Sequence, residues 1–314
     1  MMGLLVFKEH LKAFYGKYSF ILNSLKKFGL ALLVFLMLNQ NVGFMTALKN
    51  PAVLVALSLL CAFLPLSALT GLAAVFMLIH LYSLSLELAV ITGILVLSAA
   101  ILYSSFQPGN SILMVLIPLL FFIRIPYAAP LIVGLSYGLS AMIPMSFGVF
   151  LYFLLIYAKQ NAGVLVGTGT MDITQKYMQI LKSLFSNEMM LIMVIAFLAA
   201  AIVVYLIRNL SLDYSWSIAI AAGTVVELAV IFIGNSRTSV SLSIGSLAIG
   251  VLVSVILAFI FQFFVFAVDY SRTEFLQFQD DDYYYYVKAV PKIAVSTPDV
   301  KVQRINKRKE DKMQ

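Results

Sequence analysis

The sequence has 314 residues, of which 62% are hydrophobic and 11% are charged, and its formal net charge is +7. A soluble domain carries about 25% charged residues, so this composition excludes a water-soluble globular protein and predicts an all-α bundle of transmembrane helices in a lipid bilayer. The positive charge is concentrated in residues 1–27 and 271–314. This pattern indicates two polar ends beside an anionic membrane surface, and nucleic-acid binding is not expected.

Residues 1–27 are expected to form an amphipathic helix at the cytoplasmic membrane surface. Phe7, Leu11 and Phe14 recur at helical spacing, and lysines lie mostly between the apolar positions. Basic, aromatic-rich helices of this kind are typical of the lipid headgroup layer. Packing of the segment as a soluble helix against the membrane body is the alternative. A cleavable signal peptide is not expected, because the first apolar stretch is short and a basic segment follows it.

Residues 28–270 are expected to form the transmembrane domain, because a spanning helix needs about 20 apolar residues. Spans are predicted at 28–45 and 67–84, and full-length spans at 87–106, 139–158, 189–207, 214–234 and 243–269. Shorter apolar segments occupy 51–66, 111–123 and 126–138. Two basic ends on the cytoplasmic side require an even number of crossings. Ten crossings satisfy this condition, and so do eight if 111–138 is a re-entrant hairpin.

Residues 159–187 are the longest polar stretch between the predicted spans, and both topologies place them outside. The glycine-rich piece Gly163–Gly169 lacks the lysine and the third glycine of the common nucleotide-binding loops, so nucleotide binding is not expected there. Thr170 is suited to N-cap a following helix with one apolar stripe. We expect this helix to lie at the membrane interface.

Prolines break two of the hydrophobic regions, and these regions are the strongest indication of a functional site. Pro65 interrupts 51–84, and Pro118, Pro126 and Pro130 interrupt 111–144. Transporters place binding sites at such discontinuous helices, where free backbone groups and half-helix dipoles meet the ligand. The alternative is that these prolines only kink ordinary spans.

Ionisable side chains inside the apolar body are further candidates for function. Arg124 would lie at the tip of a hairpin over 111–138, either at the bilayer midplane or at its surface. Glu227 is the deepest acid of the sequence, inside the span 214–234. It either pairs with a cation, for which Arg124 is a candidate, or is protonated. His80 is expected to be an interfacial, hydrogen-bonded side chain.

Enzymatic activity, a metal site and a cofactor are not expected. The two histidines, His10 and His80, are far apart, and no cluster of His, Cys, Asp and Glu has metal-ligand spacing. The acidic run Asp280–Asp282 is followed by four tyrosines and not by further ligands, which favours solvated charge. The single cysteine, Cys61, is expected to be a small buried side chain.

Residues 271–314 are expected to form a cytoplasmic tail with β-strand propensity. Tyrosines and β-branched residues at 283–290 favour an edge strand that ends before Pro291. Since an isolated strand is unstable in water, it must pair with another tail segment, lie on the bilayer, or add to the sheet of a protein partner. The candidate partner-binding residues are Phe278, Tyr283, Tyr284, Tyr285, Tyr286 and Val287.

Two segments carry a resemblance to a known family. They are the N-terminal run Phe14–Tyr18, leading into Lys27 and Phe28, and the tail run Asp282–Lys292. They resemble uncharacterised multi-pass membrane proteins of clostridial Gram-positive bacteria, and the similarity covers most of the sequence. The resemblance implies a bacterial plasma membrane protein and assigns no activity and no functional residue.

Two functions are compatible with these features. The first is a permease-like or flippase-like transport component for a small or lipid-linked substrate. The second is a non-catalytic scaffold subunit of a cell-envelope complex that recruits a cytoplasmic partner through 271–314. The sequence does not define the oligomeric state.

Overall fold

The computed structural model describes residues 2–106, 111–167, 173–238, 243–266, 274–279 and 284–289. The chain divides into two compact units, and the larger consists of Ser19–Phe266. The smaller unit contains α1 (Met2–Lys17) and an antiparallel hairpin of β1 (Glu274–Gln279) and β2 (Tyr284–Ala289). The single helix expected over 1–27 is therefore divided at Tyr18, and residues 19–27 belong to the first long helix of the larger unit. Gly16 lies just before this break, and glycine destabilises a helix interior.

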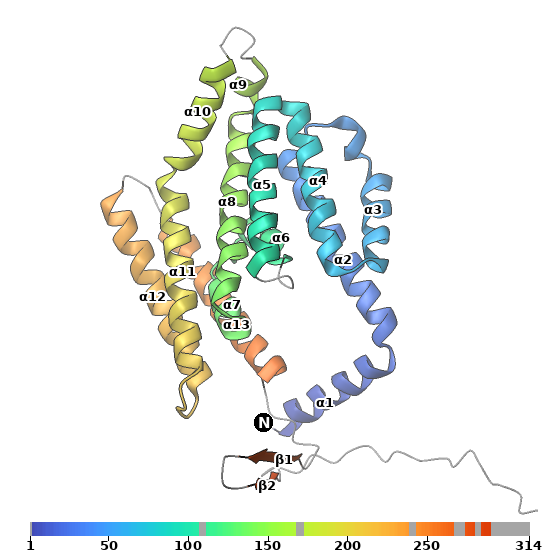
Figure 1. Cartoon of the computed structure of the whole chain (residues 1–314), viewed down its shortest axis with the longest axis vertical. Coiled ribbons are helices and arrows are strands. Elements are labelled where there is room, and N and C mark those ends of the chain that lie inside the picture. The colour runs from blue at the N-terminus through green and yellow to red at the C-terminus, as the bar shows by residue number, and fades with distance from the viewer. Residues whose placement is uncertain are drawn as a thin grey trace, which may run out of the picture. The chain divides into compact units, whose positions relative to one another are not determined.

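The larger unit is entirely helical in its described residues, and Figure 1 shows its long helices running roughly up and down the page. Among the described residues, six helices are long and apolar enough to cross a membrane, and shorter apolar stretches are α3, α6 and the Leu86–Leu102 part of α5. The elements are α2 (Ser19–Val42), η1 (Thr46–Lys49), α3 (Pro51–Phe63), α4 (Leu66–Leu84), α5 (Leu86–Phe106), α6 (Leu113–Phe122), α7 (Ala128–Ser136), η2 (Leu139–Ala141), α8 (Met142–Gln160), α9 (Ala162–Gly167), α10 (Ile173–Phe185), α11 (Glu188–Arg208), α12 (Ser215–Arg237) and α13 (Ile244–Phe266).

One end of this unit, which we call the Lys159 end, holds the last residues of α2 and α8 and the first residues of α5. Lys159 Nζ donates a hydrogen bond to Asn41 Oδ1 over 2.9 Å. Lys176 of α10 forms an ion pair with Glu87 over 3.5 Å. These contacts place α10 against the Lys159 end, which is the upper end of the unit in Figure 1.

The opposite end, which we call the Arg208 end, holds the first residues of α12 and the last residues of α13. Gln262 Nε2 donates to Ser217 Oγ over 3.2 Å and joins these two helices. Lys27 Nζ donates to the Leu64 carbonyl over 2.9 Å, so the connection between α3 and α4 also lies at this end. Both α2 and α13 therefore reach the Arg208 end at the points where the larger unit continues into the smaller one.

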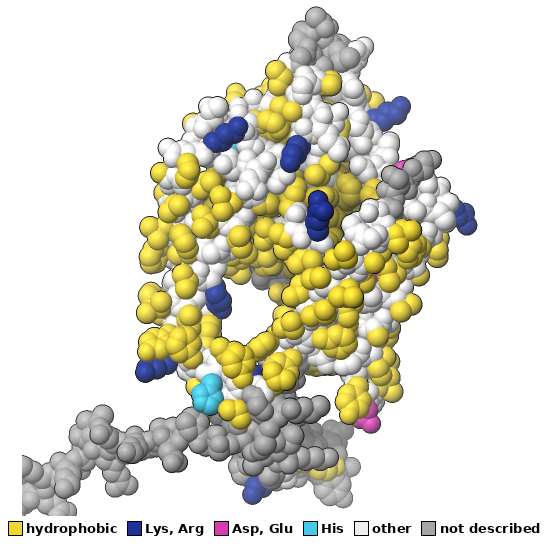
Figure 2. Space-filling model, turned by 180° about the vertical axis from the view of Figure 1, so that it is seen from behind, with side chains coloured by type: hydrophobic (Ala, Val, Ile, Leu, Met, Phe, Trp, Pro, Cys, Tyr) yellow, Lys and Arg dark blue, Asp and Glu magenta, His cyan; other side chains and the backbone are white. Residues whose placement is uncertain are grey.

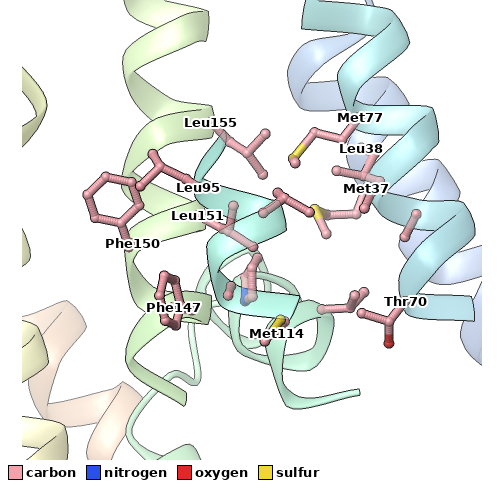
Figure 3. A pocket seen from close by; sticks show the side chains of 16 residues that line it. Met37, Leu38, Thr70, Met77, Leu95, Met114, Phe147, Phe150, Leu151 and Leu155 are labelled. Atoms are coloured by element: carbon pink, nitrogen blue, oxygen red, sulfur yellow. The ribbon is translucent and has the colours of Figure 1, made fainter. Parts of the chain in front are cut away.

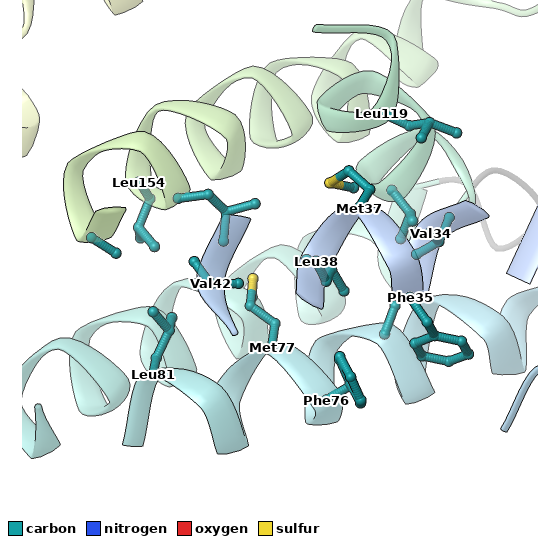
Figure 4. Packing of buried hydrophobic residues seen from close by; sticks show 14 of the residues in the cluster. Val34, Phe35, Met37, Leu38, Val42, Phe76, Met77, Leu81, Leu119 and Leu154 are labelled. Atoms are coloured by element: carbon teal, nitrogen blue, oxygen red, sulfur yellow. The ribbon is translucent and has the colours of Figure 1, made fainter. Parts of the chain in front are cut away.

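Two large apolar cores hold the helices together, and α6 and α8 contribute to both. A smaller third cluster joins α7, α11, α12 and α13. The first core joins α2, α3, α4 and α5, and Figure 4 shows Phe35, Phe76 and Met77 within it. The second core joins α7, α11, α12 and α13. The buried side chain of Cys61 belongs to the first core, as expected for a small apolar residue.

Large apolar side chains also cover the outside of the larger unit. Phe63, Val225 and Ile249 are 73%, 66% and 69% exposed, and they lie on three different helices. Figure 2 shows hydrophobic side chains over much of the visible face. A soluble monomer rarely exposes apolar patches of this extent, whereas a bilayer solvates them. The chain is therefore a membrane protein with a transmembrane helix bundle.

Close helix packing at Gly223 predicts that alanine there lowers the stability, whereas alanine at Gly71 should not. A Cβ atom at Gly223 would lie 3.1 Å from Leu131 and would overlap Val204, whose side chain is fully buried. We expect Gly223→Ala to lower the stability by about 1–3 kcal/mol. Gly71 has no heavy atom near the added Cβ position, so Gly71→Ala should be neutral or stabilising by about 0.5–1 kcal/mol.

Thermal unfolding of the two variants in detergent tests this difference. The signal is the fluorescence of Trp216, the single tryptophan, which packs against the cluster that contains Leu131 and Val204. Equal melting temperatures for both variants would mean that α12 is not in close contact with α11 and α7.

Candidate functional site

The helices α6 and α7 form a hairpin that enters the bundle and leaves it at the Arg208 end. Thr70, in the second turn of α4, donates to Ser111 just before α6 over 3.4 Å. Arg208 donates to the carbonyl groups of Leu135 and Tyr137 at the end of α7. Since α6 begins and α7 ends at one end of the bundle, the turn between them lies inside it. This is the arrangement of the eight-crossing alternative.

A left-handed residue closes α6 and starts the turn. The Arg124 amide donates to the Phe121 carbonyl and the Ile125 amide donates to the Leu120 carbonyl, both over 3.0 Å. This pair of bonds is the Schellman motif, in which glycine usually occupies the left-handed position. Arg124 occupies it here with a φ of 63°. A non-glycine residue in this conformation costs about 1–2 kcal/mol, and such strain is concentrated at functional sites.

The turn reaches the middle of α13. Ser254 Oγ lies 3.5 Å from the Ile125 carbonyl oxygen and donates to it. A Cβ atom at Gly250 would lie 2.9 Å from the Tyr127 ring and 3.1 Å from the Arg124 carbonyl oxygen. Ser254 is about 15 Å along α13, a helix about 35 Å long. The hairpin tip is therefore held at mid-depth by direct contact with the α13 backbone.

Glu227 lies at the middle of α12, close to this tip. Its side chain is 1% exposed, and neither carboxyl oxygen has a hydrogen-bond partner among the described residues. The carboxyl group is close enough to the Tyr127 phenol, itself 9% exposed, to interact with it electrostatically. A buried acid without a partner does not stabilise the fold, because its desolvation is not offset by any bond. Glu227 is therefore the strongest functional candidate in the described chain.

Arg124 and Glu227 do not form the ion pair that the sequence suggested. Neither Glu227 oxygen is bonded among the described residues, and the Arg124 side chain is exposed and within electrostatic range of Tyr152. Tyr152 of α8 stacks on Phe121 with the ring centroids 4.3 Å apart. Tyr127 is within electrostatic range of both Glu227 and Tyr152, so the two charged candidates lie around the same turn without bonding to each other.

Arg208 is a residue of the site that the sequence reasoning did not identify. Its guanidinium bonds to the carbonyls of Leu135 and Tyr137, and it lies 5.0 Å from the Tyr205 ring centroid. The last carbonyls of a helix have no partner within the helix, so Arg208 satisfies groups that the short helix α7 leaves free at its end. The sequence contains only one relevant signal, an arginine at the end of an apolar span.

The candidate prolines fall into two groups. Pro118 lies inside α6, Pro126 lies in the turn and Pro130 lies in the first turn of α7. Pro65, by contrast, precedes α4 at the α3–α4 connection, so it ends a helix and does not belong to the hairpin. His80 is fully buried, and its Nδ1 accepts a hydrogen bond from the Met45 amide over 3.2 Å.

The tail candidates are only partly described. Tyr284, Tyr285, Tyr286 and Val287 lie in β2, which pairs with β1, where Phe278 lies opposite Tyr285. The strand expected in the tail therefore pairs with another tail segment, one of the three alternatives. Tyr283, the acidic run 280–282, and Thr170 in the external segment lie outside the described residues.

Comparisons with other proteins and a search for metal sites add no further assignment. The sequence matches no protein-family model, and searches of curated proteins and of solved structures found no similar protein. Within the described residues, no three His, Cys, Asp or Glu side chains are grouped to hold a metal ion. The function must therefore be inferred from the geometry of the hairpin and its surroundings.

Proposed function

We propose that this protein is a membrane transport component of permease or flippase type, which moves a small or lipid-linked substrate. The observation that carries the proposal is the α6–α7 hairpin, whose tip lies at mid-depth beside the unpartnered carboxyl group of Glu227. Discontinuous helices with free backbone groups at this depth are the usual binding sites of transporters.

The roles of the two charged side chains follow from their positions. Glu227 is proposed to take up and release a proton or a cation, since none of the described protein groups bonds to its oxygens. Arg124 is proposed to contact an anionic group of the substrate, since its side chain is exposed and its strained backbone places it at the tip. The hairpin would couple these two side chains, because one turn carries both Arg124 and Tyr127, and the Tyr127 phenol is within electrostatic range of Glu227.

The proposed location is a bacterial plasma membrane. The six long helices of the described residues, together with α3 and α5, would give eight crossings, and the hairpin would add none, because it enters and leaves at one end. An even number is supported by the positions of Ser19 and Phe266, since α2 begins and α13 ends at the Arg208 end. The lysine-rich residues 1–17 and the basic tail both connect to that end, so we propose that it faces the cytoplasm.

Lipid translocation in proteoliposomes tests the proposed function. Vesicles of phosphatidylcholine and phosphatidylglycerol would contain a trace of NBD-labelled phosphatidylglycerol, and external dithionite would destroy the label of the outer leaflet only. We expect the wild type to expose most of the label, including the inner-leaflet half. Glu227→Gln and Arg124→Gln should each slow translocation about tenfold or more.

Glu188→Gln is the matched control, because Glu188 is an exposed acid in the first turn of α11. It should translocate lipid like the wild type. A wild-type protein that leaves the inner-leaflet label protected would rule out a flippase that acts alone on such lipids. The scaffold alternative would then be favoured, since β2 presents Tyr284 and Tyr286 with 68% and 76% exposure for a partner. A chain that ends at Tyr270 would in that case lose a protein that co-purifies with the full chain.

A further inference from the structure

An apolar cavity lies on the side of α6 that faces the first core. It lies between α2, α4, α5, α6 and α8 and is partly open to the outside of the bundle. Figure 3 shows Met37 and Met77 on one side of it, Phe147 and Leu151 on another, and Met114 of α6 near the centre of the view.

The chemistry of the walls excludes water and polar ligands from this cavity. Thr70 supplies the only hydroxyl group of the lining, and that group already donates to Ser111. A cavity water needs two to four polar partners, and apolar cavities without them stay dry or take up apolar ligands. Three of the lining side chains are methionines, which adapt their shape to an apolar guest.

The position of the cavity defines which apolar ligand is available. The cavity lies within a bundle whose outer surface is apolar and faces lipid, with Leu97 and Leu102 of α5 63% and 40% exposed. The molecules present at this depth of a bilayer are hydrocarbon chains. A chain inserted between the helices would replace the van der Waals contacts that the cavity walls lack.

We infer that the cavity between α2, α4, α5, α6 and α8 is a binding site for one hydrocarbon chain of a membrane lipid. The inference does not depend on the proposed function, since a lipid chain can bind in the cavity whether or not the protein transports a substrate. The bound chain contacts Met114, Val115 and Pro118 on one face of α6, while Ile117 and Phe121 on the other face pack in the second core. A hydrocarbon chain in the cavity would therefore contact α6, the helix that leads into the hairpin tip.

Photocrosslinking to the full-length protein in vesicles tests this site. One probe is a phosphatidylcholine with a diazirine in one acyl chain, and the other is a polyprenyl phosphate with a diazirine in its chain. We expect saturable crosslinks to peptides that contain Met114 and Phe147, mapped by mass spectrometry. Labelling by only one of the probes identifies the acyl or the isoprenoid chain as the ligand. Labelling confined to outward-facing residues such as Leu97 and Ile249 overturns the inference.

Variants that fill the cavity provide the second arm. Ala74→Phe on α4 and Ala99→Ile on α5 both place extra atoms into the lining, and each should reduce cavity labelling about tenfold. Ala221→Phe, on an exposed position of α12, is the matched control and should label like the wild type. Protection of the buried Cys61 thiol from a maleimide confirms that each variant is folded. Unchanged labelling in both folded cavity variants contradicts the proposed site.

Discussion

Replacing Glu227 by methionine should raise the stability of the protein and abolish transport. The wild-type carboxyl group is 1% exposed and has no hydrogen-bond partner in the described chain. Methionine has a similar length and adapts to its surroundings, so it removes a buried polar group without leaving a large cavity. The expected gain is about 1–3 kcal/mol, the cost of burying a polar group without a bond.

Glu87 is the matched control, because its replacement by methionine should change the stability in the opposite direction. Its carboxyl group accepts a hydrogen bond from Ser85 Oγ over 2.6 Å and pairs with Lys176 over 3.5 Å. Glu87→Met should therefore lower the melting temperature, because both partners lose their acceptor. The same chain thus contains one acid that contributes to the fold and one that does not.

Thermal unfolding in detergent measures both variants through the reactivity of Cys61, the single cysteine, which is buried until the protein unfolds. A lower melting temperature for Glu227→Met would show that Glu227 has a structural partner, and its functional role would have to be abandoned. A higher melting temperature with loss of lipid translocation is the trade-off expected of a residue kept for activity.

Hydropathy and length were sufficient to predict most helices. The expected spans at 87–106 and 214–234 correspond to α5 and α12 within one to three residues at each end. Apolar runs of this length have few alternatives in a bilayer, because every backbone group must be bonded within the segment. The early break at Tyr18 was not predicted, because the amphipathic pattern continues across it and the division depends on the local backbone.

The hairpin could not be distinguished from two short crossings by sequence, because both have the same hydropathy. Contacts between distant residues decide between them, such as Arg208 with Leu135 and Ser254 with Ile125. Of the two alternatives for Glu227, the structure does not show pairing with Arg124, because neither carboxyl oxygen has a partner among the described residues. Charge type suggested the pair, but whether two charges meet depends on the packing of α12 against the hairpin, which hydropathy does not reveal.

Replacing Arg208 by methionine should destabilise the hairpin. The guanidinium of Arg208 donates to two carbonyl groups at the end of α7, and Leu135 is 1% exposed. Methionine keeps the apolar stem and removes every donor, so these part-buried carbonyls lose their partner. We expect a loss of about 2–4 kcal/mol, the sum of one to two unsatisfied buried groups.

Two further variants separate the hydrogen bonds from the charge. Arg208→Lys keeps the charge but lacks the planar fork that bonds two carbonyls together, so it should recover only part of the stability. Arg237→Met, at an exposed position at the end of α12, should leave the melting temperature unchanged. The fluorescence of Trp216 reports the loss locally, because Trp216 packs on the cluster that contains Leu135.

The same variants connect the fold to the proposed transport. If Arg208 holds α7 and hence the tip in place, Arg208→Met should slow lipid translocation even below its melting temperature, and Arg208→Lys should lie between the two. A fully active Arg208→Met protein would mean that the tip is held by α13 alone, through Gly250 and Ser254. In that case the end of α7 would be a site of stability only, and the position of Glu227 would depend on α12 and α13.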